Sequence, residues 1–167
     1  MRPTFLFSGV FVSLPADLQN ELAERVTALG FEVVECKVGG SSRRPHLVLR
    51  IDRHDAGPGH GITVGECAVV SRALEPWLDG LGVGAGRYLL EVSSPGLERP
   101  LRRLDEWRRF LGVPAEVLVP ALGGRFRVTA LAVTEQPEPS VELEFPKGVR
   151  RTLKLSEIKE ARLTFEW

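Results

Sequence analysis

The sequence predicts an α+β fold made of two domains joined by a proline-rich step, and three observations predict it. In the first half, apolar residues recur with helical spacing in two segments and with strand spacing in three. After Gly112 the spacing is that of strands alone. Between the halves, Pro95 and Pro100 lie in a segment through which no regular element can continue. The expected divisions are an N-terminal extension at 1–13, an α/β domain at 14–96, a linker with a short helix at 97–112 and a small β-barrel at 113–167.

Composition and charge limit the class of protein. Of 167 residues, 43% are hydrophobic and 26% are charged, which is typical of a globular chain. Lys and Arg together number 22, as do Asp and Glu, so we expect any contact with nucleic acid to be local. The two cysteines, Cys36 and Cys67, are too few for a multi-cysteine zinc site and alternate or align with apolar residues. We therefore expect a cytoplasmic protein, with no cofactor and no bound metal.

The N-terminal domain is expected to have the order α-β-β-α-β in two layers. A helix is predicted from Pro15 to Leu29, where Pro15 suits the first turn and Gly30 ends the pattern. Its apolar stripe is Leu18, Leu22, Val26 and Leu29. Strands are predicted at Phe31–Val38, at 47–52 and at Tyr88–Val92.

The second helix is predicted to begin at Thr63. Thr63 and Glu66 have the spacing of a capping box, in which each residue bonds the backbone of the other. Its apolar face is expected to comprise Cys67, Val70, Leu74 and Leu78. Pro76 falls inside this pattern, so we expect the last turn to kink or to end early.

The C-terminal domain is predicted to be a small barrel, because five short strands can bury their edges by closing the sheet. A helical face formed by Leu104, Trp107 and Leu111 precedes it. The strands are expected at 115–119, 126–133, 141–145, 151–155 and 161–167. Its aromatic residues are expected to fill the core rather than to stack on bases.

Arginines in two regions are candidates for contact with RNA phosphates. The predicted hairpin loop 39–46 carries Arg43 and Arg44, and Arg50 and Arg53 follow on the next strand. A guanidinium matches the geometry of a phosphate, although a charged hairpin tip that only keeps the protein soluble is an equally good interpretation. Residues 98–109 contain five arginines and three acids, and the arginines predicted to face a partner are Arg99, Arg102 and Arg103.

The segment between the domains offers further candidates. Ser93 and Ser94 place two hydroxyl groups at a surface step, where loops commonly carry binding residues. Pro95, Gly96 and Pro100 are predicted to form the turn or hinge, because proline fixes φ and glycine permits a positive φ.

The alternative of an enzyme depends on one loop. His54, Asp55 and His60 could contribute to a metal-dependent hydrolase, but the loop contains three glycines and a proline and lacks a full ligand set. No nucleophile has a base at a recognisable spacing, so we expect a binding protein without catalytic activity. A general RNA-binding module is the third alternative, against which the balanced charge argues.

The string EVSSPGLERPL, from Glu91 to Leu101, resembles the signature of the RimP family, which comprises bacterial maturation factors of the small ribosomal subunit. The resemblance implies an N-terminal α/β domain followed by an SH3-like or Sm-like barrel. It also implies a non-catalytic factor in assembly of the 30S subunit, which binds immature subunits through their rRNA and ribosomal protein twelve. We expect such a factor to act as a monomer.

Overall fold

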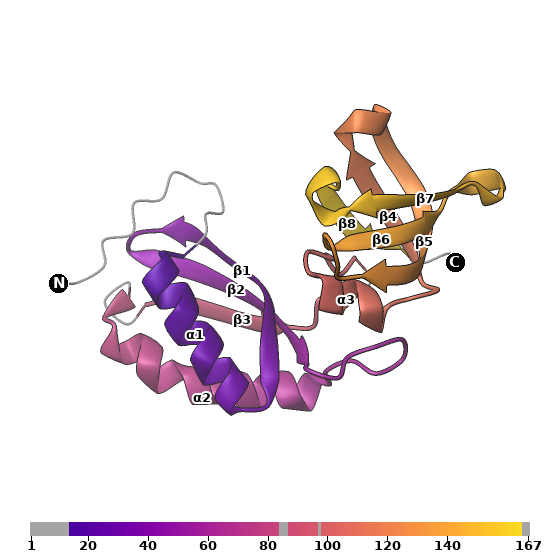
Figure 1. The fold of residues 1–167 in the computed structure, drawn as a ribbon. Helices are drawn as coiled ribbons and strands as arrows, with labels where there is room; N and C mark the ends of the chain where they lie inside the picture. The colour runs from indigo at the N-terminus through magenta and orange to yellow at the C-terminus, as the bar shows by residue number, and fades with distance from the viewer. Residues whose placement is uncertain (1–13, 84–86, 97, 165–167) are drawn as a thin grey trace. The chain divides into compact units, whose positions relative to one another are not determined.

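The computed structural model describes residues 14–83, 87–96 and 98–164, and within them the fold is α+β (Figure 1). The chain divides into two compact units, with the division between Pro95 and Gly96. The short segment Gly57–His60 is grouped with the second unit. The predicted extension at residues 1–13 lies outside the described part. Each unit has its own hydrophobic cluster.

The first unit is a three-stranded sheet with helices on one face. Its elements are α1 (Ala16–Ala28), β1 (Phe31–Ser41), β2 (Arg44–Arg53), α2 (Val64–Gly80) and β3 (Leu89–Ser93). The strand order is β1-β2-β3, with β1 antiparallel and β3 parallel to β2. This is the predicted order of helices and strands.

Alternation along β2 decides which face of that sheet is buried. Leu47, Leu49 and Ile51 are each at most 4% exposed and belong to one cluster with the buried residues of both helices. His46 and Arg50 alternate with them and therefore project from the opposite face of the sheet. That face carries polar and charged side chains, so the sheet has one apolar and one polar side.

The helices follow most of the predicted pattern. In α1 the residues Leu18, Leu22 and Val26 are buried, whereas Leu29 is exposed because the helix ends before it. In α2 the capping box between Thr63 and Glu66 is present. The predicted apolar face of α2 is buried as well: Cys67, Val70, Leu74 and Leu78.

At Pro76 the last turn of α2 was predicted to kink or to end early. The helix does not end there, and a kink stays a prediction. The helix continues to Gly80 with Pro76 inside it. Pro76 is exposed, and its neighbours Leu74 and Leu78 are only 1% and 2% exposed. Burial of these leucines, worth about 1.5–3 kcal/mol each, offsets the backbone hydrogen bond that proline removes.

The second unit is a five-stranded antiparallel sheet preceded by α3 (Leu104–Arg109). The sheet order is β7-β6-β5-β4-β8. Its strands are β4 (Pro114–Val119), β5 (Gly124–Thr134), β6 (Ser140–Glu144), β7 (Arg150–Lys154) and β8 (Glu160–Leu163). The predicted closure is not found, since no described residue of β7 pairs with β8.

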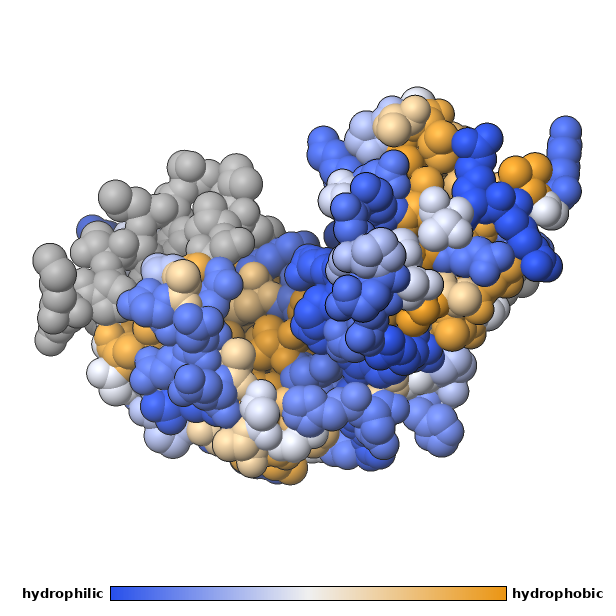
Figure 2. All heavy atoms as spheres, viewed as in Figure 1, coloured by the Kyte–Doolittle hydropathy of each residue, from blue (hydrophilic) through white to orange (hydrophobic). Residues whose placement is uncertain are grey.

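Short single-turn helices connect several of these strands. They are η2 (Pro120–Leu122), η3 (Pro146–Gly148) and η4 (Leu155–Glu157). Among the predicted aromatic residues, Phe126 and Phe145 meet edge to face with centroids 5.6 Å apart. They pack with the core, as expected, while Phe165 and Trp167 lie outside the described residues. Figure 2 shows hydrophilic residues over much of the visible face of each unit.

Candidate nucleic-acid interface

The tip of the β1–β2 hairpin holds the first pair of predicted contact residues. Ser41 pairs with Arg44, so only Ser42 and Arg43 form the turn, which is shorter than the predicted loop 39–46. The Arg44 backbone N–H donates to the Ser41 hydroxyl at 3.2 Å. The side chains of Arg43 and Arg44 are exposed, and no carboxylate of the described residues forms an ion pair with either. Their positive charges are therefore available to a partner.

Arg50 lies on the polar face of the same sheet, in a row across all three strands. Its Cα partners are Glu35 on β1 and Ser93 on β3. The Arg50 Nη1 atom lies 3.5 Å from a Glu35 oxygen, and Lys37 lies 3.2 Å from the other oxygen. Glu35 is itself only 8% exposed. The structure thus brings Arg50 and Ser93 together, and part of the arginine's charge is already compensated.

The hairpin tip and the Arg50 row lie at different places along the sheet. Arg50 follows Arg44 by six positions in the sequence. At about 3.3 Å per residue, this corresponds to about 20 Å along β2. Between them, His46 Nε2 lies 3.3 Å from a Glu91 oxygen, so a polar contact between β2 and β3 occupies the intervening face. The predicted residues of the first unit therefore form two separate groups.

Arg53 has a structural partner on the helical side of the sheet. Its Nη2 atom donates to Glu66 at 2.6 Å, and the Thr63 backbone N–H donates to the same carboxylate at 2.8 Å. The Thr63 N–H bond, and then the bond from Arg53, lower the pKa of Glu66. In the same region, the buried Asp52 accepts a hydrogen bond from the Ile62 backbone N–H at 3.0 Å. This bond fixes the end of the loop that joins β2 to α2. The Arg53 side chain, at the end of β2, thus binds the first turn of α2 through Glu66.

The step between the units has the conformation that its residues favour. Pro95 is buried and Gly96 has φ of +68°, which glycine adopts readily. Ser93 is half-buried and Ser94 is exposed. Whether Pro95, Gly96 and Pro100 form a hinge stays a prediction.

Arg99 does not face solvent, contrary to the expectation that it is available to a partner. It is 2% exposed, and its guanidinium carbon lies 5.2 Å from the Phe110 ring centroid. The backbone oxygen of Arg99 accepts a hydrogen bond from the Leu163 backbone N–H at 2.9 Å. No local pattern around Arg99 indicates this burial, because Phe110 and Leu163 meet it only through the fold of the second unit.

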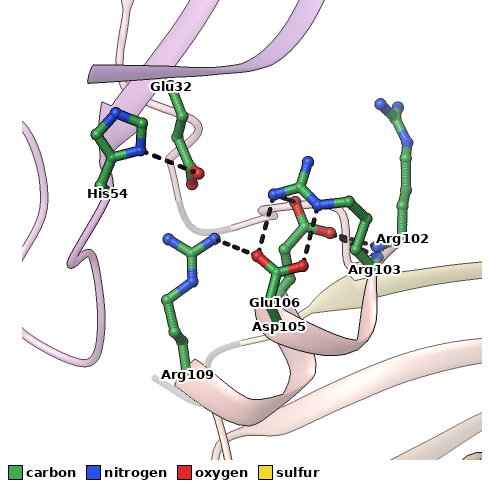
Figure 3. A network of polar contacts seen from close by, with 7 residues as sticks. All are labelled: Glu32, His54, Arg102, Arg103, Asp105, Glu106 and Arg109. Atoms are coloured by element: carbon green, nitrogen blue, oxygen red, sulfur yellow. Dashed lines mark hydrogen bonds and ion pairs between the residues drawn. The ribbon is translucent and has the colours of Figure 1, made fainter. Parts of the chain in front are cut away.

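The remaining linker arginines surround the start of α3 (Figure 3). The carboxylate of the buried Glu106 accepts hydrogen bonds from the backbone N–H groups of Arg102 and Arg103, at 2.7 and 2.9 Å. The Arg103 side chain bonds Asp105 at 3.0 and 3.1 Å, and this bond lowers the pKa of Asp105. The Arg102 side chain extends away from both acids (Figure 3). Of the three predicted linker arginines, Arg102 and Arg103 are exposed and Arg99 is buried.

The loop considered for a metal enzyme, with His54, Asp55 and His60, makes a polar contact with β1 through His54. His54 Nδ1 lies 3.9 Å from a Glu32 oxygen, as Figure 3 shows. Within residues 14–83, 87–96 and 98–164, no three His, Cys, Asp or Glu side chains form a group that could hold a metal ion. In the same ranges, no helix is long and apolar enough to cross a membrane.

Comparison with known families gives one result. Residues 21–98 match the family described as the RimP N-terminal domain. The matched range contains β1, β2, α2, β3 and the Ser93–Gly96 step. It therefore covers the hairpin arginines and the polar face of the first unit.

Proposed function

We propose that this chain, which belongs to the RimP family of ribosome maturation factors, binds immature small (30S) ribosomal subunits and promotes their assembly without catalysing a reaction. Its proposed partners are the rRNA of that subunit and ribosomal protein twelve. The family match supports the role in ribosome maturation, and the sequence Glu91–Leu101 supports the link to the small subunit. We propose that it acts in the cytoplasm as a monomer.

The main support for the proposed contact with RNA is the uncompensated positive charge at the hairpin tip. Arg43 and Arg44 are adjacent and exposed, and they have no carboxylate partner among the described residues. Arg50, Arg53 and Arg103 each form an ion pair within their own unit. An arginine already paired must give up its carboxylate before it neutralises a phosphate, whereas the hairpin arginines need not.

Balanced overall charge supports selective rather than general binding to RNA. The chain has a formal net charge of zero, so it has no broad positive field to hold it on any polyanion. Affinity must then come from a local fit between a few arginines and one arrangement of RNA and protein. Such a factor stabilises that arrangement and leaves when the mature surface no longer fits it.

We propose an SH3-like or Sm-like small barrel for the second unit. Five short antiparallel strands in the order β7-β6-β5-β4-β8, with the single turn η4 before the last strand, support this assignment. The first and last strands of the unit, β4 and β8, are neighbours in that order. The same order brings the ends of the unit's chain together.

A charge substitution at the hairpin tests the RNA contact. Arg43→Gln and Arg44→Gln together should weaken sedimentation with immature small subunits, because two phosphate contacts are lost. The slope of log affinity against log salt concentration should fall by about 2. The matched control is Arg72→Gln with Arg87→Gln, which removes two exposed arginines that also lack a carboxylate partner in the described part of the chain.

The control variant should keep the affinity and salt dependence of the original protein. If both double variants lose the same affinity, the effect is one of total charge and the hairpin is not the contact. If neither variant loses affinity at moderate salt, Arg43 and Arg44 do not bind the subunit.

A further inference from the structure

The second unit contains a pocket of about 280 Å³, and Arg102 is the one residue of its lining that also belongs to the candidate interface. It lies between the segment at residues 100–102 and the region from η4 to β8. These two stretches are joined by a bond from the Leu101 backbone N–H to Ala161 at 2.9 Å and by a bridge between Pro100 and Arg162. The apolar part of its wall comprises Pro100, Leu101, Trp107, Leu155, Ile158 and Ala161.

Three cationic side chains also line this pocket: Arg102, Lys159 and Arg162. Its one acidic lining residue, Glu160, already accepts from Arg125 at 2.6 Å. Lys159 forms no ion pair with any described residue. The Arg162 guanidinium makes a 3.4 Å contact with the backbone oxygen of Glu98, which leaves its charge uncompensated by that contact. The pocket is therefore positively charged around an apolar wall.

Trp107 is the aromatic residue of the wall, and its indole nitrogen is buried. The residue is 1% exposed, and its Nε1–H has no acceptor among the described residues. A buried N–H without an acceptor is uncommon in folded proteins, because removing it from water is unfavourable unless a hydrogen bond replaces the lost one. Because this nitrogen is not exposed, the choice of ligand depends on the cations of the pocket, which favour negatively charged oxygen atoms.

We propose that the pocket binds an acidic peptide segment of a protein partner, with an aliphatic side chain against the wall and a carboxylate between Lys159 and Arg162. A peptide fits better than a nucleotide, because stacking of a base needs an exposed aromatic face. The aromatic residue of this pocket, Trp107, is buried, and the rest of the wall is aliphatic. This site is separate from the arginines of the proposed RNA contact and does not depend on them.

The test uses three labelled probes with the full-length protein. They are a decapeptide of alternating Glu and Leu, a decapeptide of alternating Lys and Leu, and a ten-nucleotide oligouridylate. The measurements are binding by fluorescence anisotropy and the position of the Trp107 indole N–H signal in a ¹⁵N–¹H spectrum. The Trp107→Phe variant lacks this signal and so identifies it in the spectrum. The probes are then added to the unaltered protein, and the shift of the signal is measured there.

The acidic peptide should bind and shift the Trp107 indole signal, whereas the basic peptide should do neither. Lys159→Ala and Arg162→Ala should each weaken that binding by about fivefold, as expected for one partly solvated ion pair. Arg151→Ala, an exposed cation on β7 outside the pocket, should leave the affinity unchanged.

Three results would overturn this assignment. A shift of the indole signal by the oligouridylate and not by the acidic peptide would make the pocket an RNA site. No shift with any probe would show that the pocket is not a ligand site. Equal losses in the Lys159, Arg162 and Arg151 variants would show attraction to overall charge.

Discussion

Gly40 controls the hairpin that presents Arg43 and Arg44, and its replacement by alanine gives a sharp prediction. Gly40 lies in β1 opposite Pro45 and has φ of +80°. A Cβ atom at this position would lie 2.5 Å from the Arg44 backbone oxygen and 3.1 Å from the His46 backbone nitrogen. Both neighbours are backbone atoms of β2, so the strand itself must move to relieve the overlap.

The loss of stability caused by Gly40→Ala can be derived by comparison with Gly30. Gly30 also has a positive φ, of +91°, but a Cβ atom added there would have no neighbour within 4 Å. At either position, alanine in the left-handed conformation destabilises the folded state by about 1–2 kcal/mol. Alanine also reduces the conformational freedom of the unfolded chain, which offsets about 0.4–1 kcal/mol of that loss. Gly30→Ala should therefore lower the free energy of unfolding by about 1 kcal/mol. Gly40→Ala adds overpacking of about 1–3 kcal/mol, which makes about 3 kcal/mol in total.

Urea unfolding followed by ¹⁵N–¹H NMR measures this difference within the first unit. The amide signals of Val38 and Leu47, which are paired across β1 and β2, report on the hairpin. Gly40→Ala should also weaken binding to immature small subunits under conditions where the unit is still folded, because the displaced strand carries Arg44. Equal destabilisation by the Gly30 and Gly40 substitutions would refute the reasoning, since the close approach to Arg44 would then have no energetic effect.

Three further predictions concern single side chains. Because the pKa of Glu66 is lowered in the folded protein, Glu66 stabilises the first unit above the ordinary pKa of a glutamate, and this stabilisation is lost as pH falls toward the lowered pKa. The first unit should therefore lose less stability in acid when it carries Glu66→Gln. Urea titrations at several pH values would measure this difference. Burial, and then the charge of Glu35, raise the pKa of Cys36 to about 11, so about a thousandth of the thiol is ionised at pH 8. Native Cys36 should accordingly react with a thiol reagent far more slowly than in the urea-unfolded chain, and equal rates would contradict its burial. Trp107→Ala should destabilise the second unit by about 3–5 kcal/mol, because Trp107 is 1% exposed in its core; a loss below about 1 kcal/mol in urea unfolding would show that the residue is not packed there.

Local signals in the sequence predicted most helices and strands. The capping box at Thr63 and Glu66 marks the start of α2, because both partners lie within one turn. Alternation in β2 identified the buried face of the first sheet in the same way. The early end that Pro76 allowed is not found, because Leu74 and Leu78 on either side are buried and the helix continues to Gly80.

The candidate site was less predictable, because charge compensation depends on residues distant in the sequence. Arg50 meets Glu35 across two strands, and Arg53 meets Glu66 on the following helix. Nothing local distinguishes these arginines from Arg43, which has no acidic partner in the described residues. The pocket around Trp107 combines residues from 100–107 and 155–162, so only the folded second unit reveals it.

The proposed role is tested most directly by the affinity of the unaltered protein for three targets at one moderate salt concentration. These are immature small subunits, mature small subunits and random single-stranded RNA, and sedimentation measures binding to each. Affinity for immature subunits should exceed affinity for each of the other two by about tenfold or more, because selective binding requires a fit beyond phosphate contacts. Comparable affinity for random RNA would contradict the account and identify a general RNA-binding module.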